Sequence, residues 1–181
     1  MKKISITLLS FLLVFSLTSC NNESLQSYIV KSQEKKGFIT FDLPASFLQL
    51  KSDNVSQETK DALASLKKIN LVALPFQNNL EALELEKKTI EAILKQSSYK
   101  SLMRTKMKGI EVSLYYTGSE DAIDEVIAYG YKADQGVAVA RILGDDMNPA
   151  LIMKMMNDVR MNGDGLDLEK FNVLFSSINK K

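Results

Sequence analysis

Four strand-like segments follow one another in the middle of the chain, and this run limits the fold more than any other feature of the sequence. They span residues 99–107, 110–117, 123–131 and 136–143. The connectors hold turn-forming residues, among them Lys108-Gly109 and Asp134-Gln135-Gly136. Strands joined by such short connectors pair antiparallel with their neighbours in the chain. The run therefore predicts a four-strand antiparallel meander.

The second of these segments alternates between apolar and polar side chains, as a strand does when one face of its sheet is open to water. One side of the strand carries Ile110, Val112, Leu114 and Tyr116, and the other carries Glu111, Ser113, Tyr115 and Thr117. We expect the apolar side to face the core and the side with Tyr115 to face water.

Helical patterns flank the meander, and the clearest of them covers residues 79–96. Its apolar side chains, such as Leu83 and Ile90, fall on one face, and charged residues such as Glu84 and Glu91 lie opposite. The predicted order is a helix at 28–35, a strand at 38–43, helices at 45–50 and 56–68, a strand at 69–74, the long helix, the meander, and helices at 149–160 and 166–178. Such an order makes an α+β domain with a mainly antiparallel sheet, and we expect the helices to pack on one face of it. We predict one domain over residues 28–181.

Residues 1–19 have the pattern of an export signal. Lys2 and Lys3 precede a short apolar run at 4–17, which is below the roughly 20 residues that a membrane-spanning helix needs. The run ends in Leu17-Thr18-Ser19-Cys20, which resembles the lipobox of bacterial lipoproteins. We expect cleavage between Ser19 and Cys20, a diacylglyceryl lipid on the Cys20 thiol, and a short tether over residues 20–27.

Two alternatives exist for this segment: an ordinary secretory signal in which Cys20 is incidental, and an uncleaved membrane anchor. We favour the lipoprotein because Cys20 is the only cysteine of the chain, and an exported cysteine without a disulfide partner otherwise needs an explanation. Asn21 and Asn22 follow it in place of aspartate, which in well-studied Gram-negative systems favours the outer membrane. We therefore expect a cell-envelope protein that the lipid anchors in the outer membrane.

The chain has no histidine. This absence removes Ser-His-Asp and Cys-His triads, His-ligated zinc and the commonest general base near neutral pH. The 23 Lys and Arg residues nearly balance the 22 Asp and Glu residues, so no net charge attracts nucleic acid. We therefore expect a protein without catalysis, without a nucleic-acid partner, and without a cofactor other than the covalent lipid on Cys20.

One stretch near the C-terminus has part of the spacing of a calcium-binding loop. Counted as twelve residues from Asp158, it places Asn162, Asp164 and Glu169 at ligand positions 5, 7 and 12. Arg160 occupies position 3, where a calcium-binding loop needs an oxygen ligand, and it brings positive charge toward the calcium site. We favour the alternative, which is a helix C-cap at Asn162-Gly163 followed by a new N-cap at Asp164 or Asp167.

Tyrosines gather on the meander. Tyr115, Tyr129 and Tyr131 are candidates for a ligand or partner surface, because a tyrosine combines an apolar ring with a hydroxyl group. The preference of tyrosine for strands also accounts for their presence here.

The chain resembles a family of bacterial lipoproteins known as domain of unknown function 4252. Three features carry the resemblance: the apolar strand 69–74 before the long helix, the hairpin at Lys108-Gly109, and the run 137–143 leading into Gly144-Asp145 and Pro149. It covers about residues 28–172. The resemblance implies an exported, lipid-anchored α+β domain, and it brings neither an established activity nor catalytic residues.

These features predict a lipid-anchored protein that acts by binding or assembling with another envelope protein or component. A carrier of a small molecule or a metal, with its pocket between sheet and helices, is the alternative from another class. An enzyme that works with carboxylates and tyrosine is a third hypothesis. An exposed apolar or aromatic patch on the meander would favour the binding module, and an enclosed apolar pocket would favour the carrier.

Overall fold

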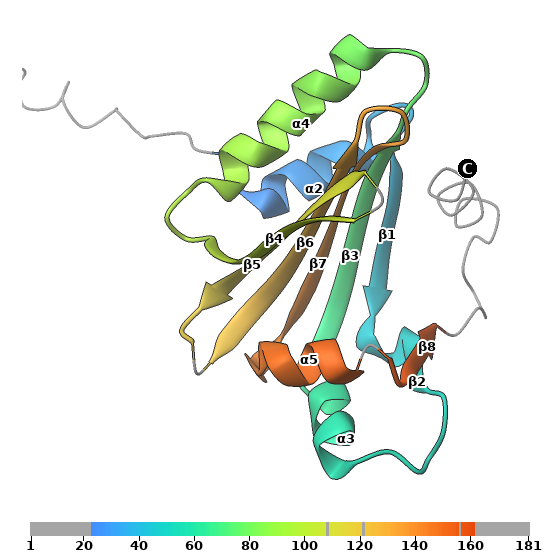
Figure 1. The fold of residues 1–181 in the computed structure, drawn as a ribbon, viewed down its shortest axis with the longest axis vertical. Helices are drawn as coiled ribbons and strands as arrows, with labels where there is room; N and C mark the ends of the chain where they lie inside the picture. Colours follow the sequence, from blue (N-terminus) through green and yellow to red (C-terminus); the bar gives the residue numbers. More distant parts are fainter. Residues whose placement is uncertain (1–22, 108, 121, 156, 162–181) are drawn as a thin grey trace, which may run out of the picture.

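The computed structural model describes residues 23–161, apart from residues 108, 121 and 156. These residues form a six-stranded antiparallel sheet, a two-stranded sheet and the helices around them (Figure 1). The elements in chain order are α2 (Leu25–Gln33), β1 (Ile39–Pro44), the 3-10 helix η2 (Ala45–Phe47), β2 (Leu48–Leu50), α3 (Gln57–Ala64), β3 (Leu66–Pro75), α4 (Leu80–Leu94), β4 (Lys100–Met107), β5 (Ile110–Gly118), β6 (Ile123–Lys132), β7 (Gly136–Met147), α5 (Pro149–Met155) and β8 (Val159–Met161).

The predicted meander is confirmed. The order of the large sheet is β1-β3-β7-β6-β5-β4, so the four strands of the meander are neighbours in space as well as in sequence. β3 pairs with β7, with Val72 opposite Val139, and β1 pairs with the other edge of β3. The α+β class is thus confirmed, with β1 and β4 as the edges of the large sheet.

One face of the large sheet is covered by α2 and α4, and we call it the helix-covered face. Leu25 and Tyr28 of α2 and Leu83 of α4 are fully buried in one apolar cluster with Ile127 and Val139 of the sheet. Each helix begins at a capped residue: the Ser24 and Asn79 side chains accept hydrogen bonds from the N–H groups of Ser27 and Ala82. The caps and the apolar contacts together fix both helices on this face.

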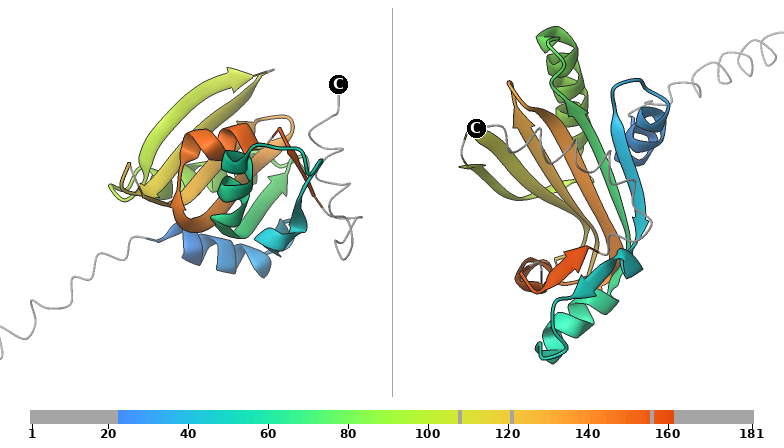
Figure 2. Two further views of the ribbon diagram at one scale, coloured as in Figure 1. Left: turned by 90° about the horizontal axis from the view of Figure 1, so that it is seen from below. Right: turned by 90° about the vertical axis from the view of Figure 1, so that its right-hand side faces the viewer.

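Within the described residues, helices cover the opposite face only at one end. There α3 and α5 pack against each other, and Ile152 and Met155 of α5 join an apolar cluster with Tyr116 and Val126 of the sheet. Figure 2 shows α2 on one side of the sheet and α5 on the other. The helices of the chain therefore do not all share one face, because α3 and α5 close the end where β7 turns into α5.

The orientation predicted for β5 is wrong. Tyr115 points to the helix-covered face and is buried, whereas Val112 and Leu114 on the opposite side are only half-buried. Tyr115 is the buried residue on this side of β5, and a polar side chain can be buried in this way when its polar group finds a partner. The neighbouring tyrosines of β6 find such partners on α4, as the next subsection describes.

The predicted tether extends too far into the domain. Leu25 is 0% exposed, and residues 25–27 form the first turn of α2 rather than a free linker. Ser19 and Cys20, and with them the predicted signal peptide, lie outside the described residues.

Three predicted helices are shorter than expected. The helix predicted at 56–68 ends at Ala64, and residues 66–68 belong to β3. The segment 45–50 is a single 3-10 turn followed by β2, and α5 ends at Met155. β8 follows and pairs with β2, and the N–H of Lys51 extends this pairing by donating to the carbonyl oxygen of Asp158 at 2.8 Å. The strand forms because the pairing satisfies backbone groups that a helix end would leave open. The predicted helix 166–178 lies outside the described residues.

Candidate functional site

A groove of about 490 Å³ runs between α4 and strands β4, β5 and β6. It is lined by Glu91 and Lys95 of α4, Arg104 and Thr105 of β4, Glu111, Val112, Ser113 and Tyr115 of β5, and Tyr129 of β6. This volume lies within the range of roughly 300–1,000 Å³ that small-molecule sites occupy. We call it the α4 groove.

The three tyrosines predicted as a binding surface come together beneath α4. Tyr115, Tyr129 and Tyr131 are 7%, 4% and 6% exposed, so they do not form the exposed surface that the sequence suggested. They are buried because α2 and α4 cover this face of the sheet. Tyr115 and Tyr129 still line the α4 groove.

Tyrosine hydroxyl groups tie α4 to its surroundings through carboxylates. The Tyr129 hydroxyl donates to Oε1 of Glu91 at 3.4 Å, and the Tyr131 hydroxyl donates to Glu84. The helical pattern of residues 79–96 predicted that both acids lie opposite the apolar face of the helix. The spacing of these residues could have predicted the pairs. Glu84 and Glu91 are seven residues apart and therefore lie on one face of the helix, and Tyr129 and Tyr131 are two residues apart and therefore lie on one face of their strand.

Burial next to these carboxylates changes the acidity of the tyrosines. Loss of solvent, together with the Glu84 hydrogen bond and charge, raises the pKa of Tyr131 to about 12. Burial and the nearby Glu86 and Glu91 charges raise the pKa values of Tyr28 and Tyr129 still further. These phenols are therefore neutral hydrogen-bond donors at physiological pH, which suits a structural or binding role better than proton abstraction.

Cations lie against two of the three tyrosines, and of these cations Arg104 lines the α4 groove. The Arg104 guanidinium donates to the Tyr115 hydroxyl at 3.4 Å and lies 5.8 Å from the centroid of its ring. The Lys87 ammonium lies 3.9 Å from the Tyr131 ring centroid and 3.9 Å from a Glu111 carboxylate oxygen. Acidic and basic groups thus alternate around the tyrosines, so the groove offers partners for both signs of charge.

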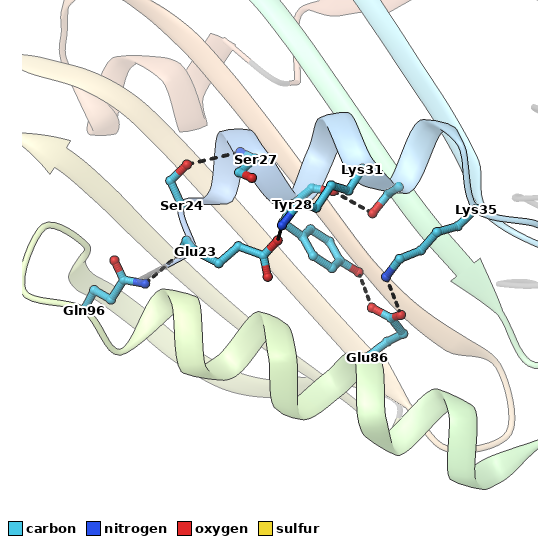
Figure 3. A network of polar contacts seen from close by, with 9 residues as sticks. Glu23, Ser24, Ser27, Tyr28, Lys31, Lys35, Glu86 and Gln96 are labelled. Atoms are coloured by element: carbon cyan, nitrogen blue, oxygen red, sulfur yellow. Dashed lines mark hydrogen bonds and ion pairs between the residues drawn. The ribbon is translucent and has the colours of Figure 1, made fainter. Parts of the chain in front are cut away.

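A second network joins α2 to α4 (Figure 3). The Tyr28 hydroxyl donates to Oε2 of Glu86 at 3.1 Å, and the Lys35 ammonium binds the other oxygen of the same carboxylate at 2.8 Å. At the far end of α4 the Gln96 side-chain amide donates to the carbonyl oxygen of Glu23 at 2.8 Å. The chain that enters the domain at residue 23 is therefore held at the C-terminal end of α4.

The opposite face of the sheet carries a different surface, which we call the open apolar face. It consists of eight half-buried residues without a polar side chain: Leu71, Ile110, Val112, Leu114, Ala128, Gly130, Ala138 and Ala140. A hollow of about 130 Å³ lies at one end of it, where Ile110, Gly130 and Ala138 are among the lining residues. Contiguous apolar surface of this kind marks places where another apolar element packs.

Comparison with protein families identifies the domain. A family model described as a domain of unknown function (DUF4252) matches residues 28–155. The chain belongs to the DUF4252 family. The match runs from α2 through the whole sheet to the end of α5, so it includes both the α4 groove and the open apolar face. No match was found among curated proteins or among solved structures.

Within residues 23–161 of this DUF4252 protein, no helix has the length and apolar character needed to cross a membrane. The same part of the chain holds no group of three or more His, Cys, Asp or Glu residues arranged to bind a metal ion.

Of the four predicted ligands of the calcium loop, the structure describes only Asp158, and residues 159–161 of the loop form β8. Its carbonyl oxygen accepts the hydrogen bond from Lys51, and the Lys51 ammonium reaches the carbonyl oxygen of Asn157 at 2.7 Å. Asn162, Asp164 and Glu169 lie outside the described residues, so the calcium loop stays a prediction.

Proposed function

We propose that this DUF4252 protein is an exported, lipid-anchored protein of the cell envelope that works without catalysis and binds another envelope protein. The open apolar face is the observation that carries the binding role. Seven of its eight residues lie on the meander, where they expose apolar area, and such a patch is the property expected of a partner module. The lipobox-like Leu17-Thr18-Ser19-Cys20 supports the anchor.

The absence of catalysis is supported by the chemistry of the buried groups. The chain has no histidine, and Cys20 is assigned to the lipid. Two pairs of polar residues in the α4 groove bind each other, Tyr129 with Glu91 and Tyr115 with Arg104. Such pairs stabilise the packing of a helix on a sheet without needing a substrate.

The binding role is tested by crosslinking the intact lipoprotein in membranes and identifying what co-purifies. We compare Leu114→Gln, on the open apolar face, with Leu85→Gln, whose side chain is 64% exposed on the outer side of α4. We expect Leu114→Gln to lose the crosslinked partner and Leu85→Gln to keep it. Recovery of a lone monomer from wild-type membranes, or equal crosslinking by both variants, would overturn the proposal.

The anchor is tested separately by Cys20→Ala. We expect the wild-type chain to incorporate labelled fatty acid and to enter the detergent phase, and we expect the variant to do neither. Equal labelling of both chains would rule out a lipid on Cys20.

The α4 groove favours a second candidate, a carrier of a small zwitterionic molecule. Lys95 and Arg104 supply positive charge, and Glu91 and Glu111 supply negative charge around two tyrosine rings. A panel of amino acids and other small zwitterions can be screened by thermal unfolding. A ligand at 100 times its Kd stabilises a protein by about 2.7 kcal/mol. Arg104→Gln should abolish any such shift, and a panel without a shift would remove this candidate.

A further inference from the structure

We propose that the edge strand β4 binds an extended peptide segment in which acidic and apolar residues alternate, and that this segment adds a strand to the large sheet. The inference rests on the proposed binding function and deepens it, because it names the chemistry of a segment of the partner. Three properties of β4 support it: its position in the sheet, the faces of its side chains, and its charge.

β4 is an edge of the large sheet, so among the described residues no strand pairs with one side of its backbone (Figure 1). A strand edge of this kind presents N–H and C=O groups that another extended chain can bind. The register with β5 is continuous from Met103 to Met107, after a bulge between Ser101 and Met103. Five residues of strand are about 17 Å long, which is a common length for a strand. We call residues 103–107 the β4 edge.

The other edge of the large sheet, β1, is less suitable for an added strand. Its last residue, Pro44, has no N–H group and therefore cannot donate to a neighbouring strand. The chain then turns into η2, and Phe47 of this turn packs against the apolar cluster that contains Phe41 of β1. β4 has no proline, and its residues from Lys100 to Lys106 are all exposed. The β4 edge is therefore the more accessible of the two.

The side chains of the β4 edge alternate between a basic face and an uncharged face. Arg104 donates to the hydroxyl of Tyr115, which points to the helix-covered face. Lys106 is two residues further along β4, so both cations lie on this side of the sheet. Met103 and Thr105 lie on the side of the open apolar face, and Met103 is 38% exposed. An added strand would therefore place one set of its side chains beside cations and the other set beside Met103.

The charge of β4 favours an acidic partner. Its charged residues are Lys100, Arg104 and Lys106, and it has no acid. Within the described part of the chain, neither Arg104 nor Lys106 forms an ion pair. Glu111 is opposite Lys106 on β5, but it lies about 10 Å, or two strand spacings, from an added strand, which is close to the Debye length. An acid opposite each cation would therefore stabilise an added strand.

The same charge disfavours pairing between the β4 edges of two copies of the chain. β4 carries three cations among its eight residues, so two identical edges would bring like charges together across the new strand pair. Lysine on an edge strand is a common protection against such pairing. The charge of the β4 edge thus opposes a second copy and favours a strand of opposite charge.

The experiment measures the binding of peptides to the full-length protein in detergent by fluorescence anisotropy. The probe is a fluorescein-labelled peptide of seven residues in which valine and glutamate alternate, and the control peptide has lysine in place of glutamate. We expect the glutamate peptide to bind about tenfold more tightly, because the cross-strand charge pairs with Arg104 and Lys106 are attractive in one complex and repulsive in the other. Equal binding of the two peptides, or no binding of the glutamate peptide, would overturn the proposal.

A second pair of peptides tests whether the backbone of β4 takes part in binding. In an added strand, alternate N–H groups of the peptide point toward β4 and the others point away from it. The glutamate peptide is therefore N-methylated either at its valines or at its glutamates. We expect one of these two peptides to lose binding and the other to keep it. The same result for both methylated peptides would overturn the proposed strand addition.

The variant Lys106→Gln tests the position of the site, and Lys60→Gln, which removes the charge of an exposed lysine of α3, is its matched control. We expect Lys106→Gln to weaken the binding of the glutamate peptide by about threefold, with an unchanged circular dichroism spectrum. Lys60→Gln should bind this peptide as the wild type does. Equal affinities of the two variants would overturn the assignment to β4.

Two further outcomes separate this inference from its alternatives. A protein dimer that the glutamate peptide dissociates would assign the β4 edge to a second copy and overturn the proposal. Membrane crosslinking that is lost in Leu114→Gln, in a protein that does not bind the glutamate peptide, overturns this inference and leaves the proposed function in place. Binding of the glutamate peptide without any crosslinked partner in membranes supports the β4 site and overturns only the proposed function.

Discussion

Single buried polar groups decide how α4 is held on the sheet. The Tyr131 hydroxyl donates to Glu84, and burial beside this carboxylate raises the pKa of Tyr131 from 10.0 to about 12. The folded protein thus holds the phenol proton more tightly than the unfolded chain does. A raised pKa stabilises the fold fully below pH 10, and this contribution is lost as the pH rises through 12.

We therefore predict that the free energy of unfolding falls between pH 10 and pH 12, and that Tyr131→Phe reduces this fall. One titrating group contributes up to about 1.4 kcal/mol per pH unit in this window. Urea unfolding of both proteins at pH 8, 10 and 11 measures the difference. The same decline with pH in wild type and Tyr131→Phe would contradict the assigned role of this pair.

Arg141 is a second residue whose burial has consequences. It is 7% exposed beneath α2, forms an ion pair with Glu125, and donates to the Gln26 side chain. We predict that Arg141→Met lowers the free energy of unfolding by about 3 kcal/mol, because it leaves Glu125 as an unpaired, largely buried charge. The double variant Arg141→Met with Glu125→Gln should recover a large part of the loss. Equal unfolding free energies for the single and double variants would show that the charge of Glu125 is not the cause.

At the scale of elements, the sequence predicts strands and the starts of helices better than it predicts the faces they present. The strand segments of the meander and the predicted helix starts at Ser56, Asn79 and Pro149 agree with the structure, in which Ser56 and Asn79 are N-caps and Pro149 is the first residue of α5. These features depend on local backbone chemistry, so nearby residues are enough to predict them.

The orientation of β5 could not be predicted in the same way. Both sides of this strand are compatible with burial: Leu114 is apolar, and the Tyr115 hydroxyl finds a polar partner in Arg104 of β4. The choice depends on α2 and α4, whose residues are distant in sequence. The same cause hid the α4 groove, because Glu91, Arg104 and Tyr129 come together only when α4 folds back over the meander.

The turn between β6 and β7 depends on a glycine, Gly136, and this allows a prediction about the stability of the fold. Gly136 has a φ of +136°, and a Cβ atom there would lie 2.4 Å from the carbonyl oxygen of Leu74 on β3. We predict that Gly136→Ala lowers the free energy of unfolding by about 2 kcal/mol or more, because β7 must move away from β3. Gly130→Ala is the matched control in the neighbouring strand and should change it by less than about 1 kcal/mol. Similar losses in both variants would show that neither the positive φ of Gly136 nor its close approach to β3 sets the cost.

For the whole molecule, the short distance in sequence between Cys20 and the first buried residue limits how a lipid-anchored domain can be oriented on a membrane. Only four residues separate Cys20 from the buried Leu25, and a fully extended chain of this length reaches at most about 17 Å. Gln96 binds Glu23, so the C-terminal end of α4 lies at the same place. If Cys20 carries the lipid, this end of the molecule faces the bilayer, and the loop before α3 lies far from it (Figure 1).

This geometry gives a prediction that uses spin labels on introduced cysteines. Ser97, beside the end of α4, and Ser52, in the loop before α3, are both exposed and can each be changed to cysteine. In the anchored protein we expect a lipid-soluble relaxation agent to affect a label at position 97 more strongly than one at position 52. A ten-residue Gly-Ser insertion after Asn22 should remove most of this difference, because a flexible linker of that length adds roughly 16–19 Å of reach. Equal relaxation at both positions without the insertion would show that the short connection to Cys20 does not orient the domain.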